Sequence, residues 1–175
     1  MELILFEAGA AGDLVAATID PYDYTLYNNR IMPLIDQVTK RYERIKLRTR
    51  AKDILTDDEL DLYIKNVKYK SLASHAFDYH IRKKHKFILI DSSEERYAKW
   101  ATNKYNQLSP KKTRTGNYLQ YHAHINCYEK LKNHTNRFLK LKDILNGNML
   151  FKLEILTGQK YSDKFYKKWL ENNKF

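Results

Sequence analysis

Two glycines follow a short apolar run near the start of the chain, and their spacing suggests phosphate chemistry. Glu2 to Phe6 (ELILF) is typical of a buried parallel strand, and residues 13–19 (DLVAATI) have a helical composition. A glycine loop between a strand and a helix points backbone N–H groups and the positive helix end at one spot, which suits a phosphate or sulfate. The sequence therefore predicts an anion site in this segment. Its candidate residues are Gly9, Ala10, Ala11, Gly12, Asp13 and Leu14.

Asp13 leaves a second interpretation of this segment open. A full phosphate loop ends in a lysine that supplies charge and a hydroxyl that binds magnesium. This loop has Asp13 instead, and its carboxylate would repel a phosphate at close range. A tight turn, with Asp13 as an ordinary N-terminal cap of the helix, is an equally good interpretation.

His75 is the candidate for acid–base chemistry. It lies in a predicted short strand, Ser71 to Phe77 (SLASHAF), next to Ser74. A histidine at the end of a strand that faces a phosphate loop can act as a general base or contact an anion. The alternative is that His75 is a packed core or surface residue.

Two other groups of residues have chemical potential. His122, His124 and Cys127 do not share one helix face, so we predict no metal site and interpret Cys127 as a small buried hydrophobe. Lys112 and Arg114 belong to a basic, turn-rich segment, residues 109–116 (SPKKTRTG), which is a candidate for anion contact or a solvated loop.

The elements that must position these residues alternate between strand and helix. Thr56 and Glu59 form a capping box before a predicted helix. Alternation of this kind predicts an α/β fold with a mostly parallel sheet covered by helices, in three layers. The other predicted strands are residues 87–90 and 137–141, and the other predicted helices are residues 30–44, 94–106, 118–133, 143–156 (with a break near 146–148) and 163–172.

Composition limits the class of protein. The chain has 175 residues, is 43% hydrophobic and has one cysteine, so we expect one domain over residues 1–175 without disulfides, in a reducing compartment. It shows neither a signal-peptide pattern nor a run of about 20 apolar residues, so we expect a cytoplasmic protein with no membrane partner. The formal charge of +11 favours polyanions, which include nucleotides, nucleic acid and acidic proteins.

The order of these elements is similar to that of the P-loop sulfotransferases, whose core resembles that of nucleotide kinases. Gly9 to Asp13 occupies the place of the phosphosulfate loop in that family, and Ser74-His75 that of a Ser/Thr-His pair. Phe87 to Ser93, with the helix to Tyr105, resembles the unit that holds the cofactor's 3′-phosphate. Phe138 to Leu145 (FLKLKDIL) and Leu150 to Gly158 (LFKLEILTG) resemble the segments that follow.

The resemblance implies a P-loop fold that binds phosphoadenosine phosphosulfate or a nucleotide, with sulfuryl or phosphoryl transfer and His75 facing the reacting group. Arg96, Lys99, Lys112 and Arg114 would then supply positive charge. Three positions depart from the family pattern: Asp13 replaces the loop lysine or threonine, Asp91 stands where an arginine is expected, and Lys99 where a serine is expected.

The alternative hypothesis is a non-catalytic, degenerate P-loop protein. Its positive charge would dock nucleic acid or an acidic protein partner. The short, Lys-, Asn- and Tyr-rich chain also resembles small phage-encoded proteins of this type, for which the expected location is the host cytoplasm.

Overall fold

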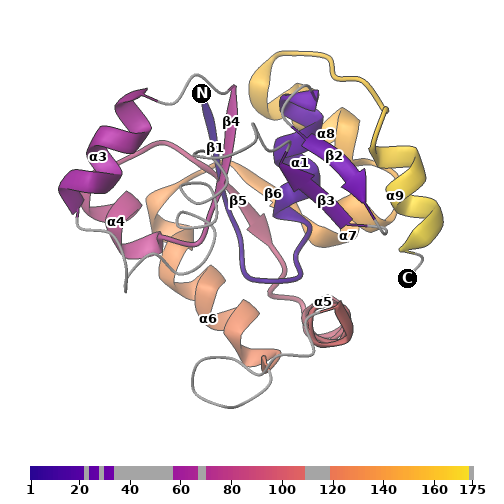
Figure 1. Cartoon of the computed structure of the whole chain (residues 1–175). Coiled ribbons are helices and arrows are strands. Elements are labelled where there is room, and N and C mark those ends of the chain that lie inside the picture. Colours follow the sequence, from indigo (N-terminus) through magenta and orange to yellow (C-terminus); the bar gives the residue numbers. More distant parts are fainter. Residues whose placement is uncertain (22–23, 28–29, 34–56, 67–69, 109–118, 174–175) are drawn as a thin grey trace.

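A computed structural model describes residues 1–21, 24–27, 30–33, 57–66, 70–108 and 119–173 of the chain. Four parallel strands form its central sheet in the order β4 (Ser71–Ser74), β1 (Glu2–Leu5), β5 (Ile88–Asp91) and β6 (Phe138–Lys140). Helices flank this sheet (Figure 1), so the expected α/β class with a parallel sheet is confirmed.

Alternation along the strands divides the apolar residues between two cores. On β1, Ile4 belongs to one core, whereas Leu3 and Leu5 belong to the other. On β5, Ile88 and Leu89 divide in the same way. Such strands are buried on both faces, as parallel strands covered by helices must be. The predicted strand at residues 87–90 is therefore confirmed within one residue.

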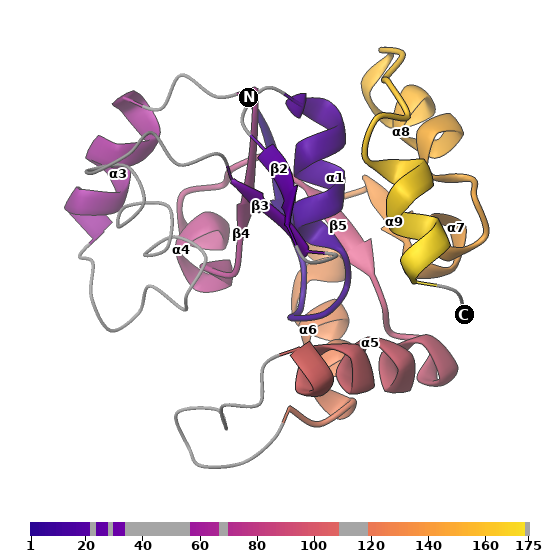
Figure 2. The ribbon, with the colours of Figure 1, turned by 45° about the vertical axis from the view of Figure 1, so that its right-hand side comes forward.

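Different helices pack on the two cores. The core that contains Ile4 includes residues of α1 (Gly12–Ile19), α7 (Leu141–Leu145), α8 (Met149–Thr157) and α9 (Tyr166–Asn172). The core that contains Leu5 includes residues of α4 (Phe77–Arg82) and α6 (His122–Leu131), with α3 (Asp57–Asn66) beside it through Ile64. Figure 2 shows α3 and α4 on one side of the sheet and α7 to α9 on the other.

Two sequence predictions need correction. Residues 30–33 are a strand, β3 (Arg30–Pro33), which pairs antiparallel with β2 (Tyr24–Tyr27), and not the start of a helix. The rest of the predicted helix, residues 34–44, lies outside the described residues, as does Thr56 of the capping box. The strand predicted for residues 71–77 ends at Ser74, because Phe77 begins α4.

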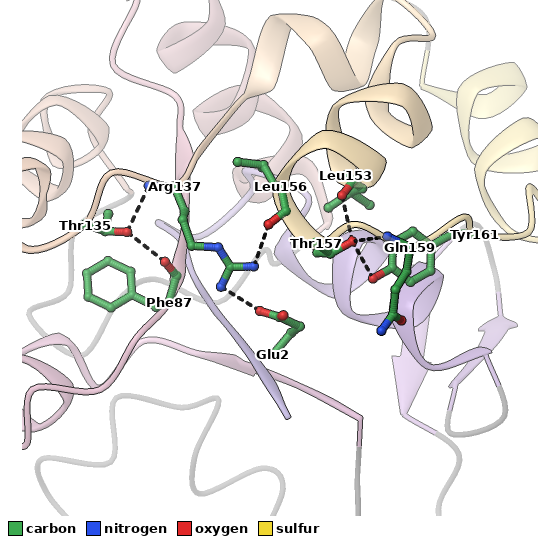
Figure 3. Close-up of polar contacts among 9 residues, drawn as sticks. All are labelled: Glu2, Phe87, Thr135, Arg137, Leu153, Leu156, Thr157, Gln159 and Tyr161. Atoms are coloured by element: carbon green, nitrogen blue, oxygen red, sulfur yellow. Dashed lines mark hydrogen bonds and ion pairs between the residues drawn. The ribbon is translucent and has the colours of Figure 1, made fainter.

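Arg137 connects two strands and a helix at the edge of the sheet where the strands begin. Its guanidinium donates to the Glu2 carboxylate at 2.8 Å and to the Leu156 carbonyl at 3.1 Å, which joins β1 and β6 to the end of α8 (Figure 3). The helix α8 ends as the sequence predicts. Gly158 adopts a left-handed conformation and donates its N–H group to the backbone carbonyl of Glu154.

A further helix, α5 (Glu95–Leu108), lies at the opposite edge, where the strands end. In both views it lies close to the loop that leaves β1 (Figures 1 and 2). The 3₁₀ turn η3 (Lys132–His134) follows α6. Within the described residues, every helix is too short or too polar to span a bilayer.

Candidate functional site

The loop between β1 and α1 contains two residues with a left-handed backbone. Gly9 has a φ of 89° and Ala11 a φ of 61°, so both lie in the left-handed region. Ala11 is the N-cap of α1 and makes no side-chain cap. Left-handed and right-handed residues in succession turn their N–H groups toward one concave point, which is a common anion-binding arrangement. The first N–H groups of α1 add to this point, since they have no carbonyl partner inside the helix.

The two glycines are also required by protein packing. A Cβ atom on Gly9 would lie 2.3 Å from the carbonyl oxygen of Ala101 on α5. A Cβ atom on Gly12 would lie 2.1 Å from the ring of Phe6. The loop is therefore held closely against α5 and against the end of β1. This packing requires glycine at both positions whether or not the loop binds an anion.

Two carboxylates belong to the same loop and helix start. Glu7 accepts the N–H group of Ala8 on Oε1 at 2.9 Å, and its carbonyl accepts the N–H group of Ala10 at 3.0 Å. Asp13 lies in the first turn of α1, and its Oδ1 atom is buried. Both negative charges lower the affinity of this point for a phosphate.

His75 lies beside Phe6, at the end of β1 where the loop begins. Its Nδ1 atom is 2.7 Å from the carbonyl oxygen of Phe6, and its ring packs on the Phe6 ring with centroids 4.3 Å apart. A carbonyl oxygen only accepts, so Nδ1 carries the proton and, in the neutral ring, the lone pair is on Nε2. The His75 tautomer that this contact selects is therefore the one with a basic Nε2 atom.

Ser74 takes part in a buried hydrogen-bonded chain. Its Oγ atom accepts the N–H group of Ala76 at 3.1 Å and lies 2.9 Å from Nε2 of His80, whose Nδ1 lies 3.0 Å from Nδ1 of His85. Burial lowers the pKa of His80 to about 3, so its ring is neutral at physiological pH. Ser74 is fully buried, and this series of hydrogen bonds supports the turn after β4.

A small polar pocket opens where β5 and β6 end. Its volume is about 220 Å³, and the carboxylate of Asp91 at its wall accepts two hydrogen bonds from Ser93. Asp91 stands where the resemblance requires an arginine, so this strand end lacks that guanidinium. Among the described residues, the lining is Asp91, Ser93, Glu94, Tyr97, Lys140 and Lys142.

Two of the remaining predicted cations, Arg96 and Lys99, lie on α5. Arg96 lies over the ring of Tyr97, at 4.8 Å from its centroid, and Lys99 forms an ion pair with Glu95 on the surface of α5. Lys112 and Arg114 lie outside the described residues. Of the predicted site residues outside the loop, the structure therefore places His75 beside the end of β1 and Arg96 and Lys99 on α5, with the partners given above.

The sequence reasoning missed two buried polar residues, Ser92 and Thr102, and considered His124 only as a metal ligand. Ser92, directly after β5, bonds Nδ1 of the buried His124 on α6 at 2.7 Å. Burial lowers the pKa of His124 to about 4. Thr102 on α5 is also buried, and its hydroxyl oxygen has no hydrogen-bond partner among the described residues. Contact between the end of β5 and α6, together with the burial of one face of α5, reveals the surroundings of these residues, which no local motif predicts.

The described residues contain no group of three or more His, Cys, Asp or Glu side chains that could hold a metal ion. Cys127 is a buried free thiol, and burial raises its pKa well above the usual range, as expected for a small packed residue.

Comparison with known proteins found no matching family, no matching curated protein and no matching solved structure.

Proposed function

We propose that this chain binds a phosphorylated nucleotide or sulfonucleotide at the edge of its sheet where the strands end. The observation that carries the proposal is the left-handed Ala11 at the uncapped start of α1, which gathers backbone N–H groups at one point. A non-glycine residue adopts this conformation at a cost of about 1–2 kcal/mol, and such strain is typical of functional loops.

The topology of the sheet supports the same place. The chain passes from β1 to β4 on one side and then returns to β5 on the other side, so the direction of winding reverses between β1 and β5. In open parallel sheets, ligands bind outside the strand ends at such a reversal. The loop of residues 7–11 lies at this reversal.

His75 gives the proposed site a base for group transfer. Its Nε2 atom would take the proton of an acceptor hydroxyl while that oxygen attacks the sulfuryl or phosphoryl group and the nucleotide departs. Positioning and charge stabilisation would supply the rest of the rate. In this proposal the protein is a P-loop, sulfotransferase-like transferase.

The carboxylates of Glu7 and Asp13 favour a second candidate function. Both belong to the loop and helix start and oppose a phosphate there, whereas the whole chain carries a charge of +11. In this second candidate, the fold is non-catalytic, and its basic surface binds nucleic acid or an acidic protein.

Calorimetric titration with adenosine 3′,5′-bisphosphate, ATP and a short DNA duplex separates the two candidates. The first predicts saturable nucleotide binding that Asp13→Asn tightens about fivefold, because the substitution removes a like charge beside the anion. Glu154→Gln is the matched control, since this residue lies on α8 near the far edge of the sheet, and it should leave the affinity unchanged.

DNA binding alone, with an affinity that falls steeply with salt, would support the second candidate and reject the first. Gly12→Val is unsuitable as a test, because its side chain would collide with the Phe6 ring and disturb the fold.

A further inference from the structure

The pocket at the ends of β5 and β6 is lined by charges of both signs. Asp91 and Glu94 come from the end of β5 and the turn after it. Lys140 and Lys142 come from the end of β6 and from α7. In open parallel sheets, ligands bind outside the carboxyl ends of the strands, and this pocket lies there. Its described lining includes no residue of the loop of residues 7–14.

The opposite charges around this pocket do not pair with each other. Asp91 and Lys140 are register partners on neighbouring parallel strands, which lie about 4.8 Å apart. Within the described part of the chain, neither residue forms an ion pair, and the same holds for Glu94 and Lys142. The Asp91 carboxylate instead accepts the N–H and hydroxyl groups of Ser93 on Oδ1, at 3.0 and 2.6 Å. These two bonds leave its other oxygen, Oδ2, available for a ligand.

Two of these charged residues, Asp91 and Lys142, are partly buried. A partly buried charge loses hydration, and a counter-charge is needed to replace what is lost. A simple anion would meet the repulsion of the two carboxylates, and a simple cation would meet that of the two lysines. A ligand with one positive and one negative group supplies both counter-charges, so the lining favours a zwitterion.

The volume of the pocket limits the ligand to a small molecule. It is about 220 Å³, below the range of about 300–1,000 Å³ for pockets that hold drug-sized ligands. The described lining contains no Leu, Ile, Val or Met side chain, and Tyr97, its aromatic residue, is only 6% exposed. A large apolar group would therefore gain little here, and a compact molecule with two charges fits better.

We propose that this pocket binds a small zwitterion of the amino-acid class. Lys140 and Lys142 bind its carboxylate. Asp91, through Oδ2, and Glu94 bind its ammonium group. The bonds from Ser93 hold the Asp91 carboxylate in place before the ligand arrives, which lowers the entropy lost on binding. This ligand is separate from the proposed nucleotide, and its binding does not depend on the nucleotide site.

Residue-resolved NMR titration of the full chain at pH 7 tests this proposal. The probes are glycine, β-alanine and 4-aminobutyrate, which carry the same two charges at increasing separation. Acetate and methylammonium are the single-charge analogues. We expect a saturable shift of the amide resonances of residues 91–94 and 140–142 with at least one zwitterion, which binds about tenfold more tightly than either analogue.

Two results would overturn the proposal. One is an analogue that binds as tightly as the zwitterions, and the other is the absence of a saturable shift at these residues with all three probes. Neither result affects the nucleotide titration, which reports on the amide groups at the start of α1. The failure of one proposal is therefore distinguishable from the failure of the other.

Variants identify the groups that bind. Asp91→Asn keeps the oxygen that accepts from Ser93, and it should weaken zwitterion binding about fivefold while it tightens acetate binding by about the same factor. Lys142→Gln should weaken the binding of both. The matched controls are Asp163→Asn and Lys167→Gln, which change the same charges in a surface ion pair outside the described lining and should leave both affinities unchanged. Equal effects of the pocket and control substitutions would indicate only a general charge effect and reject the site.

Discussion

At the scale of single residues, the hydroxyl groups of the helical threonines differ in how they affect the stability of the fold. Thr18 and Thr157 have bonded hydroxyl groups, whereas the buried Thr102 hydroxyl oxygen has no partner in the described structure. A buried polar group without a partner destabilises the fold by about 1–3 kcal/mol.

Thr102→Val should therefore raise the free energy of unfolding by about 1 kcal/mol, because it replaces an unsatisfied hydroxyl with a methyl group of the same shape. Thr18→Val is the matched control: it removes a bonded hydroxyl and should lower the free energy of unfolding by about 0.5–1.5 kcal/mol. Urea unfolding of the three proteins measures both changes. A loss of stability in Thr102→Val would mean that its hydroxyl is satisfied in the folded protein.

At the scale of elements, the contact between the β1–α1 loop and α5 fixes the candidate site. Gly9 is tightly packed on the backbone of Ala101, and Gly12 on the ring of Phe6. His75, from the turn after β4, bonds the backbone at the end of β1. Three separate segments thus meet at the edge where the strands end, and the position of the loop depends on α5 as much as on its own sequence.

Gly9→Ala and Gly147→Ala isolate this contact. Both glycines have a left-handed φ, of 89° and 86°, so both substitutions introduce the same backbone strain of about 1–2 kcal/mol. A Cβ atom on Gly147 meets no atom within 4 Å, whereas one on Gly9 meets the Ala101 carbonyl oxygen. Gly9→Ala should therefore destabilise the protein by about 1–3 kcal/mol more than Gly147→Ala in urea unfolding. Equal losses would show that the loop is not packed on α5.

Sequence patterns predicted most strands of the central sheet, whereas contacts between separate segments were not predictable in this way. The apolar run at residues 87–90 and the alternation at 137–141 each became a strand, because such patterns depend on local burial. Residues 30–33 were assigned to a helix from the spacing of Ile31, Leu34 and Ile35, but pairing with β2 decides their conformation. Pairing between two strands, like the bond from Arg137 to Glu2, leaves no periodic signal in the sequence.

At the scale of the whole molecule, buried histidines couple folding to pH. Burial lowers the pKa of His80 to about 3, that of His124 to about 4, and that of the partly buried His85 to a lesser degree. Asp61 favours the charged form of His85, while Lys83 opposes it. The unfolded chain has ordinary histidine pKa values near 6.5. As the pH decreases, its histidines therefore bind protons at a higher pH than those of the folded chain.

Stability should fall as the pH decreases below about 6.5. Each of His80 and His124 should contribute a loss of about 2 kcal/mol by pH 5, since protons then favour the unfolded chain. Urea unfolding between pH 7 and pH 5 measures this loss. His124→Gln should reduce the slope of the free energy of unfolding against pH by the equivalent of about one proton. A flat profile over this range would contradict neutral burial of the two rings.

The central claim is that a phosphorylated nucleotide binds at the start of α1, and residue-resolved NMR tests it most directly. Titration with adenosine 3′,5′-bisphosphate should shift the amide resonances of residues 11–14 and the ring resonances of His75 saturably, with a common dissociation constant. The claim would be contradicted if the resonances of these residues stayed unchanged. In that case the shifts would spread over the lysine-bearing surface and vanish with added salt.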